Sequence, residues 1–236
     1  MCTVSFINAG GRVIITSNRD EKPGRQPVLA PKNTMINRKK VFFPKDPEAG
    51  GTWYAVDEFG TVIVLLNGAA EKHTRKPKYR MSRGLVVLEL TGQESPLAYW
   101  NTIDLNEIEP FTIVLFEKGG LYQLRWDGTA KETKHLNSSE SYIWSSVTLY
   151  SARVRQQREI WFREFLAATP VVTEENVIAF HRFTHVANTE NGLVINRPGG
   201  PMTLSITQTI LEANKVHFSY LDLMKQDSFT KTFLSV

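Results

Sequence analysis

The stretch CTVSFINAGGRVIITSNRDE, residues 2–21, carries the clearest structural signal in the chain. Two apolar runs, 3–7 and 12–16, flank the pair Gly10-Gly11. Apolar runs separated by paired glycines are typical of a β-hairpin. The stretch therefore predicts two antiparallel strands in which residue 2 lies opposite residues 17–20.

Beyond this hairpin, blocks of predicted strands alternate with blocks of predicted helices. Further strands are predicted at 40–43, 52–56, 61–66, 111–116, 121–126, 204–211 and 216–221. Helices are predicted from Ser82 to about Leu90, after Ser95-Pro96, over about Ser151 to Ala168, and from Thr173 to about His181. Ser82, Ser95 and Thr173 are the predicted capping residues. The proline-rich residues 23–31 predict a long surface loop.

Strands in consecutive blocks favour antiparallel sheets over repeated βαβ units. The sequence therefore predicts an α+β fold in which two antiparallel sheets are flanked by helix pairs, as one domain over residues 1–236. The longest predicted helix carries the four arginines Arg153, Arg155, Arg158 and Arg163, which are expected on its solvent-exposed side.

The composition is that of a globular domain, with 42% hydrophobic and 22% charged residues. No apolar run reaches the roughly 18 residues of a membrane span, and the N-terminus lacks a signal-peptide pattern. We therefore expect a cytoplasmic protein without stable membrane insertion. The net charge of +4 is too small to imply nucleic acid binding. The oligomeric state is not defined by the sequence.

The chain contains one cysteine, at position 2, so an internal disulfide and a multi-cysteine zinc site are excluded. A residue as small as Cys favours removal of the preceding Met1, which would expose an α-amine beside the thiol. Both groups titrate near neutral pH, and such an amine can serve as base for its own side chain. Cys2 is thus a candidate nucleophile, and its alternative is a cysteine that lies near the terminus by chance.

The polar residues that close the hairpin are the next candidates for the site. The predicted pairing places Asn18 or Asp20 near the α-amine of Cys2, where a carboxylate or amide would orient it. Their alternative role is turn formation, which Asn and Asp favour. Asn67 follows the apolar strand at 61–66 and precedes Gly68, so its amide is a candidate oxyanion donor, or part of an Asn-Gly turn.

Four features follow one another along the chain: Cys2, the run Asn18-Arg19-Asp20-Glu21, the segment 50–53 and the segment 60–67. In this order they resemble the transport and Golgi organisation protein 2 family, also called NRDE. The resemblance implies an αββα N-terminal nucleophile hydrolase fold, similar to choloylglycine hydrolases and acid ceramidases. It implies that Cys2 is the nucleophile, that Asn18 and Asp20 form the Asn-x-Asp pattern, and that Asn67 donates to the oxyanion.

The resemblance also suggests residues that contact substrate. Where the amide hydrolases carry an arginine before Asn-x-Asp, this chain has Ser17, and Arg19 or Arg25 is a candidate source of that charge. A second oxyanion asparagine is expected after the middle strands, where the nearest candidate is Ser146. Trp53 is expected in the core or the pocket wall. Thr207 to Thr209 resemble a family segment in which an arginine often precedes, at the position of Ile206.

Two weaker patterns favour ordinary roles. His181 and His185 have the i, i+4 spacing of metal ligands, but no third ligand accompanies them, and we expect a partly exposed helix end and no metal. The segment 71–83 carries six Lys and Arg residues, which favours a solvated loop over an anion-binding surface.

The leading hypothesis is an N-terminal cysteine hydrolase or acyltransferase that acts, without a cofactor, on a small amide or related acyl compound. The alternative is a non-catalytic binding or trafficking protein for a hydrophobic cofactor such as haem or acyl-CoA, which the resemblance permits. A purely structural or partner-binding role is the third hypothesis. Retention of Met1 would favour that role over catalysis, because the base would then be part of a peptide bond.

Overall fold

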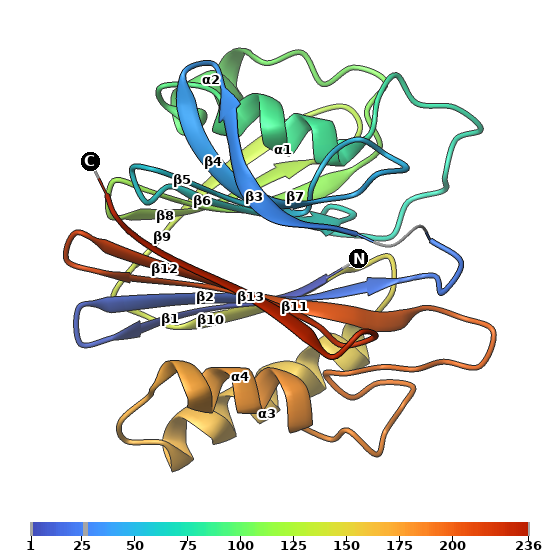
Figure 1. Ribbon diagram of the computed structural model, residues 1–236. Coiled ribbons are helices and arrows are strands. Elements are labelled where there is room, and N and C mark those ends of the chain that lie inside the picture. The colour runs from blue at the N-terminus through green and yellow to red at the C-terminus, as the bar shows by residue number, and fades with distance from the viewer. Residues whose placement is uncertain (1, 26–27, 236) are drawn as a thin grey trace. The chain divides into compact units, whose positions relative to one another are not determined.

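The computed structural model describes residues 2–25 and 28–235, which include two antiparallel sheets and four helices (Figure 1). The chain divides into two structural units. The first comprises residues 2–25 and 139–233, and the second comprises residues 28–138 with 234–235. The single domain predicted over residues 1–236 stays a prediction.

The sheet of the first unit has the order β10-β1-β2-β11-β12-β13. Its strands are β1 Cys2–Ala9, β2 Arg12–Glu21, β10 Tyr142–Ser145, β11 Met202–Glu212, β12 Lys215–Asp222 and β13 Asp227–Leu234. The predicted hairpin is present as β1 and β2, and Cys2 pairs with Arg19, within the predicted window. The hairpin therefore lies in the interior of the sheet, between β10 and β11.

Two helices cover one face of this sheet (Figure 1). They are α3 Ala152–Ala168 and α4 Glu174–Phe183. The Ser151 side chain caps α3. Thr173 caps α4, as the sequence predicts, and forms a capping box with Asn176. Ile7, Ile14 and Ile210 of the sheet pack against Trp161, Phe162, Val177 and Phe180 of the helices. Apolar packing therefore fixes both helices on the sheet.

The sheet of the second unit has the order β3-β4-β5-β6-β7-β8-β9. Its strands are β3 Leu29–Ile36, β4 Lys39–Lys45, β5 Tyr54–Asp57, β6 Val62–Asn67, β7 Phe111–Glu117, β8 Gly120–Trp126 and β9 Lys131–Leu136. The helices α1 Arg83–Thr91 and α2 Pro96–Thr102 pack on this sheet, α1 against β5 and β6 and α2 against β7. Between strands and helices lie Val86, Leu90, Trp100 and Phe111, all fully buried.

Four strands escaped prediction, namely β3, β9, β10 and β13, and they are the edge strands of the two sheets. The proline-rich loop predicted to reach residue 31 is wrong at its end, because β3 begins at Leu29 and includes Pro31. Proline is tolerated in an edge strand, where an N–H group can be missing from the ladder. Among the described residues, no helix combines the length and the hydropathy that crossing a membrane requires.

Candidate functional site

Cys2 is the first residue of β1, and 1% of its surface is exposed. Its carbonyl oxygen accepts a hydrogen bond from the backbone N–H of Ser146 at 3.0 Å. Cys2 pairs with Arg19, and Thr3 pairs with Asn18. In this antiparallel register, the backbone nitrogen of Cys2 is directed along β1 toward the position across from Asp20. The thiol of Cys2, the backbone of Ser146 and the position across from Asp20 therefore lie together at the start of β1.

The two faces of the first unit's sheet carry different chemistry near this point. Thr3 contacts Arg158 of α3 and Ser5 contacts His181 of α4, so these side chains point toward the helices. Because side chains alternate along a strand, the side chain of Cys2 lies on the opposite face. Ser17 and Arg19, both buried, share that face with it. Burial raises the pKa of the Cys2 thiol, and the negative charge of Asp20 acts in the same direction.

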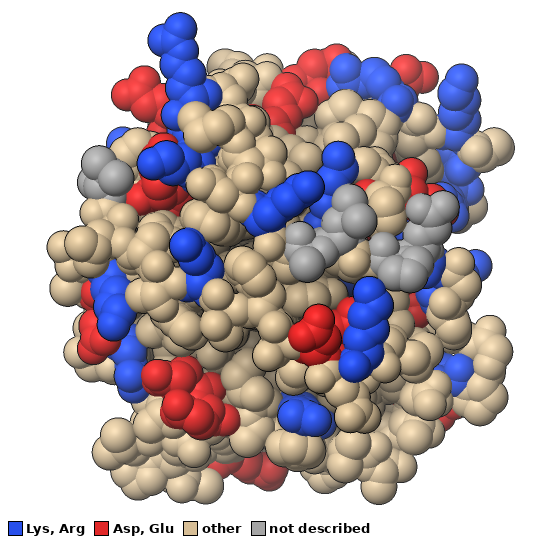
Figure 2. Space-filling model, viewed as in Figure 1, with Lys and Arg blue, Asp and Glu red and all other residues tan. Residues whose placement is uncertain are grey.

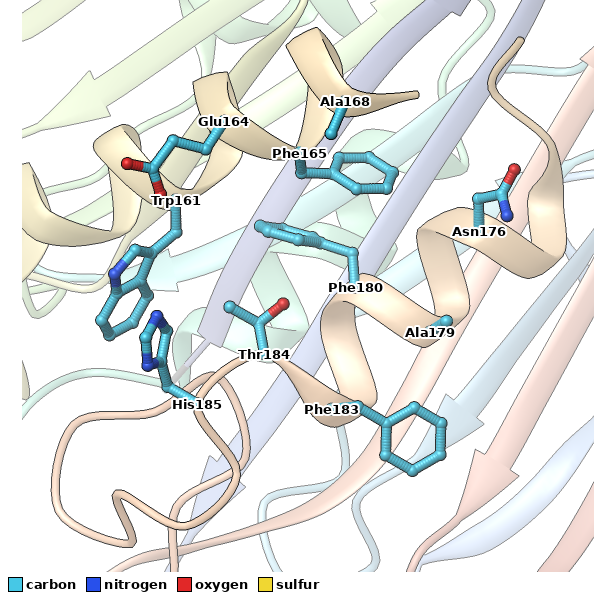
Figure 3. Close-up of a pocket in the computed structure, with 10 residues that line it drawn as sticks. All are labelled: Trp161, Glu164, Phe165, Ala168, Asn176, Ala179, Phe180, Phe183, Thr184 and His185. Carbon is cyan, nitrogen blue, oxygen red and sulfur yellow. The ribbon is translucent and has the colours of Figure 1, made fainter. Parts of the chain in front are cut away.

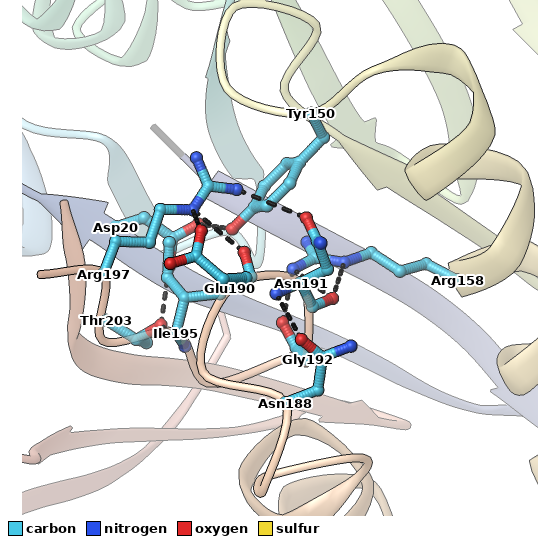
Figure 4. Close-up of polar contacts among 10 residues, drawn as sticks. All are labelled: Asp20, Tyr150, Arg158, Asn188, Glu190, Asn191, Gly192, Ile195, Arg197 and Thr203. Atoms are coloured by element: carbon cyan, nitrogen blue, oxygen red, sulfur yellow. Dashed lines mark hydrogen bonds and ion pairs between the residues drawn. The ribbon is translucent and has the colours of Figure 1, made fainter. Parts of the chain in front are cut away.

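Asp20 lies on the helix side of the sheet and has no exposed surface. Its two carboxylate oxygens accept separate hydrogen bonds, from the Tyr150 hydroxyl at 2.6 Å and from the Thr203 hydroxyl at 2.7 Å (Figure 4). Burial raises the pKa of Asp20, while the charge of Arg158 and these two hydrogen bonds lower it. Asp20 is therefore a buried carboxyl whose charged form depends on its neighbours.

The side chain of Asn18 is fully occupied by other contacts. Its Nδ2 donates to the carbonyl oxygens of His181 at 3.0 Å and Leu193 at 2.8 Å, and its Oδ1 lies 2.6 Å from His181 Nδ1. His181 Nε2 in turn lies 2.7 Å from Ser5 Oγ. Asn18 thus links β2 to α4 and to the Leu193 segment, and its predicted part in orienting the amine of Cys2, like that of Asp20, stays a prediction.

His181 is fully buried, so the expectation of a partly exposed helix end is wrong for this residue. Burial, together with the nearby charge of Arg158, lowers its pKa to about 3. The imidazole is therefore neutral at physiological pH and acts as a hydrogen-bonding residue between α4 and the sheet. Among the described residues, no cluster of three or more His, Cys, Asp or Glu side chains has the arrangement of a metal site.

Arg158 was expected on the solvent-exposed side of its helix. That expectation is wrong, because its side chain is fully buried. It donates to Thr3 Oγ1 and to the carbonyl oxygens of Asn191 and Gly192, and its guanidinium lies 3.6 Å from the centre of the Tyr150 ring. Arg158 precedes Trp161 by three residues and Phe162 by four, so it lies on the same face of α3 as these two buried side chains. The hydrogen-bond acceptors that compensate its burial come from distant segments and give no local signal.

The remaining predicted residues lie in several places. Ser146 is buried beside Cys2, and its hydroxyl lies 3.0 Å from that of Thr148. Trp53 and Asn67 belong to the second unit, where Trp53 is buried. Asn67 ends β6, and the following Gly68 has a φ of 85°, which glycine adopts without strain. The roles assigned to these residues by resemblance stay predictions.

A groove on the first unit runs between α3 and α4 (Figure 3). Its volume is about 530 Å³, and four of its ten lining residues are Phe or Trp. Trp161 stacks on His185 with ring centres 4.1 Å apart, and Phe165 stacks on Phe180 at 4.7 Å. Phe183 at its rim is 58% exposed. The groove is thus a second candidate region, which sequence patterns did not reveal, although His185 in its lining is one of the two histidines with the spacing of metal ligands.

The basic segment 71–83 lies in the second unit and is largely exposed. Arg83 is anchored on Glu109 at 3.0 Å, and Arg80 contacts Asp104 at 3.6 Å. On the face seen in Figure 2, Lys and Arg side chains are interspersed with Asp and Glu. The expectation that the protein binds no nucleic acid stays a prediction.

Solved structures with similar folds define the class. A Caenorhabditis elegans orthologue of N-acylethanolamine-hydrolyzing acid amidase is 11% identical, with a TM-score of 0.63 over 88% of this chain and 92% of its own. A cysteine-to-alanine mutant of conjugated bile acid hydrolase from Clostridium perfringens is 11% identical, with a TM-score of 0.51 over 99% and 96%. The fold is therefore N-terminal nucleophile hydrolase-like, as predicted.

The sequence then gives the particular family. The family model described as Transport and Golgi organisation 2 matches residues 1–197, and the chain belongs to this family. The resemblance seen in Cys2 and the Asn18-Arg19-Asp20-Glu21 run is thereby confirmed at the level of the family. No curated protein matches the sequence.

Proposed function

We propose that the protein is an N-terminal cysteine hydrolase or acyltransferase that acts on a small amide or related acyl compound. The observation that carries this proposal is the geometry at the start of β1. The thiol of Cys2 is buried there, and the backbone nitrogen of the same residue is directed toward the position across from Asp20. The similar solved structures are an acid amidase and a bile acid hydrolase. We extend the same broad reaction type to this chain.

The proposal requires removal of Met1, because only then does the nitrogen of Cys2 become a base. Burial raises the pKa of the thiol, so little thiolate is available at neutral pH without a proton acceptor. The α-amine fills this role and takes the thiol proton as sulfur attacks the substrate carbonyl. Asp20 orients the amine and stabilises its protonated form.

The remaining steps follow from the same groups. The ammonium returns its proton to the leaving amine as the carbon–nitrogen bond breaks, which leaves a thioester on Cys2. Water, or the acceptor in a transfer reaction, then attacks the thioester, and the α-amine takes its proton. The carbon–sulfur bond breaks, the acyl product leaves, and the ammonium returns the proton to the Cys2 thiolate. Asn67 is the proposed side-chain donor to the oxyanion. Arg19, Ser17, Trp53 and Ser146 are proposed to contact substrate.

The test uses full-length protein whose N-terminus has been verified by intact mass. Protein without Met1 is incubated with a p-nitrophenyl ester and with a fatty acyl p-nitroanilide, and release of the chromophore is followed. Peptide mapping then locates the acyl group. We expect a thioester on Cys2 and repeated turnover.

The controls separate the nucleophile from the base. Cys2→Ala removes the sulfur and should abolish both adduct and turnover. The wild-type sequence purified with Met1 retained, from cells whose methionine aminopeptidase is inhibited, keeps the sulfur but lacks the free amine. It should lose turnover to a similar extent. An adduct that persists in Cys2→Ala, or a Met1-free wild type that forms none, refutes the proposal.

A second candidate function is binding of a hydrophobic ligand such as haem or an acyl-CoA. The aromatic groove between α3 and α4 favours it, because apolar concave surfaces with a few polar groups are typical ligand sites. Titration with haem and with a long-chain acyl-CoA tests this candidate in wild type, Phe183→Ser and Cys2→Ser. Saturable binding that is weakened by Phe183→Ser but not by Cys2→Ser supports it in this groove. Equal binding by all three excludes the groove as the site, and the absence of saturable binding in wild type contradicts the function.

A further inference from the structure

Asp20 is held in a way that suggests additional functional residues. Both of its oxygens accept hydrogen bonds from neutral hydroxyl groups, and no ion pair to it is found within the described part of the chain. A carboxylate buried without a contacting cation is costly, so it is retained where its charge has a use. The groups that hold it come from three segments that are distant in sequence.

The first of these groups, Tyr150, is tied to Cys2 through the backbone. The carbonyl of Cys2 accepts from the N–H of Ser146, and the carbonyl of Ser146 accepts from the N–H of Tyr150, each at 3.0 Å. The Tyr150 hydroxyl then donates to Asp20. The turn between β10 and α3 therefore fixes the proposed nucleophile and the carboxylate with respect to each other.

The second group, Thr203, reaches Asp20 because of a β-bulge. In the ladder between β2 and β11, Arg19 pairs with Ser205 and Asp20 pairs with Thr203, so that Leu204 is skipped. A regular ladder would place Leu204 opposite Asp20. The bulge replaces this apolar side chain with a hydroxyl, which donates to Asp20 and accepts from the N–H of Ile195 at 2.9 Å. Bulges that redirect a side chain are common beside active sites.

The third group is Arg158, whose planar guanidinium stacks on the Tyr150 ring while the hydroxyl of the same ring binds Asp20 (Figure 4). Its hydrogen-bond partners are hydroxyl and carbonyl oxygens, so Asp20 is the negative charge that offsets it at short range. Tyr150 separates the two charges and prevents a direct ion pair. The charge of Asp20 is thereby stabilised, while no cation of the described residues contacts either of its oxygens.

We infer that Tyr150, Thr203 and Arg158 are positioning residues, which keep Asp20 ionised and directed toward the α-amine of Cys2. This inference rests on the proposed function. It goes beyond it by assigning the control of the base to three side chains outside the hairpin. Asp20 would otherwise take up a proton in its buried surroundings and lose its effect on the amine.

Other ionisable groups surround Asp20 and have to be separated in the test. They are Cys2 on β1, Arg19 and Glu21 on β2, Arg158 on α3, His181 on α4 and Arg197 of the loop before β11. Arg197 lies 5.5 Å from the centre of the Tyr150 ring, and the low pKa of His181 keeps it neutral above about pH 4. Substitution of uncharged hydroxyl donors leaves all of these groups in place.

The experiment therefore compares Tyr150→Phe and Thr203→Val with wild type in Met1-free protein. The carboxyl titration of Asp20 is followed by ¹³C NMR of aspartate-labelled protein, with the resonance assigned by Asp20→Asn. The rate of acylation of Cys2 is measured over the same pH range. Loss of a hydrogen bond to a charged group corresponds to roughly a tenfold change in equilibrium constant. In both variants the Asp20 carboxyl should titrate at higher pH. Acylation of Cys2 should be slower than in wild type on the acid side of the pH–rate profile.

Two matched variants show whether the effect is specific. Tyr99→Phe removes a tyrosine hydroxyl that donates to Glu89 at 2.6 Å in the second unit, and it should leave both measurements unchanged. Thr203→Ser retains the hydroxyl and should restore the titration lost in Thr203→Val, which keeps the test valid if Tyr150→Phe is unstable.

An unchanged Asp20 titration in folded Tyr150→Phe or in Thr203→Val overturns the inference. If the titration moves but wild type shows no acylation, the proposed function fails while control of the Asp20 charge stands. If wild type acylates but the variants keep its acid limb, the positioning role fails and the proposed function stands.

Discussion

Each of the two sheets buries one aspartate completely, and the two aspartates are held in opposite ways. Asp57, at the end of β5, forms an ion pair with Lys39 at 2.5 Å and accepts from the backbone N–H of Thr61 at 2.8 Å. Asp20 has hydroxyl partners, with its counter-charge beyond a tyrosine ring. Asp57 is thus neutralised by a contacting cation, whereas Asp20 has no contacting cation among the described residues.

The layers between helices and sheet also differ, because one is apolar and the other contains buried polar side chains. Under α1 and α2 the second sheet packs Val86, Leu90 and Trp100 in an apolar core. Under α3 and α4 the apolar cluster gives way, near the start of β1, to Asn18, Arg158 and His181, all fully buried. Buried polar groups contribute less to stability than apolar packing does. The first unit therefore contains an arrangement whose retention is better explained by chemistry than by stability.

The largest effect that separates the two aspartates should be on reaction rate. Asp20→Asn removes the charge that orients and stabilises the protonated amine, so acylation of Cys2 should fall by a factor of about 10² to 10⁴. Asp57→Asn, assayed at a temperature where it is folded, should keep the rate within a few-fold of wild type. The measurement is the single-turnover rate on Met1-free protein. Equal losses in both variants would remove the distinction between a functional and a structural carboxylate.

The second effect concerns stability, and here substitution of Asp57 should have the large effect. Asp57→Asn leaves Lys39 buried without its partner, and breaking such a pair costs about 3–5 kcal/mol of unfolding free energy. Glu58→Gln is the matched control, because its partner Lys40 lies 4.0 Å away and is 58% exposed, and a loss of no more than about 1 kcal/mol is expected. Urea denaturation at pH 7 measures both. A similar loss in the two variants would show that the Lys39–Asp57 pair is not structural.

Much of the fold follows from local sequence, and the strands that do not are instructive. The interior strands β6 and β7 are nearly continuous apolar runs and are buried along almost their whole length. The edge strands lack this pattern. β9 reads KETKHL and is mostly exposed, and β13 begins with charged and polar residues. Their pairing is dictated by the neighbouring strand, which a local reading of the sequence does not reveal.

The site divides in the same way. The pairing of Cys2 with the 17–20 stretch follows from the hairpin alone, because only a short turn separates the strands. Tyr150 and Thr203 are 130 and 183 residues from Asp20, and the bulge at Leu204 has no sequence signature. Arg158 had the position of a buried residue on its helix and the chemistry of an exposed one. Only the tertiary structure resolves that conflict.

The third effect concerns acid stability and tests the polar layer of the first unit. The pKa of His181 is about 3 in the folded protein and about 6.5 in an unfolded chain. Between these values the unfolded chain binds a proton that the folded protein does not, so stability falls as pH decreases from 6.5 toward 3. The loss approaches about 1.4 kcal/mol per pH unit. Denaturation at several pH values should show a shallower loss in His181→Gln than in wild type.

The exposed His185→Gln provides the control for this prediction, because it removes a histidine of the same segment that is solvent-accessible. It should follow the wild-type pH dependence. If His181→Gln also follows it, the buried imidazole takes up a proton in the folded state, and the neutral hydrogen-bonding role assigned to it is wrong.

The smallest effect concerns the helix caps and asks whether α4 can be weakened without disturbing the polar layer beneath it. Thr173 caps α4 with its side chain in a reciprocal pair with Asn176, so Thr173→Ala should cost about 1 kcal/mol. Ser82 precedes α1 without a side-chain cap bond and donates to the Ala49 carbonyl instead, so Ser82→Ala should cost less. Thr173→Ala should leave the acylation rate of Cys2 unchanged, because His181 is bonded to Ser5 and Asn18 at the other end of α4. A slower rate in this variant would mean that the geometry around Asp20 depends on the whole helix, and the layer could then no longer be regarded as fixed by its own hydrogen bonds.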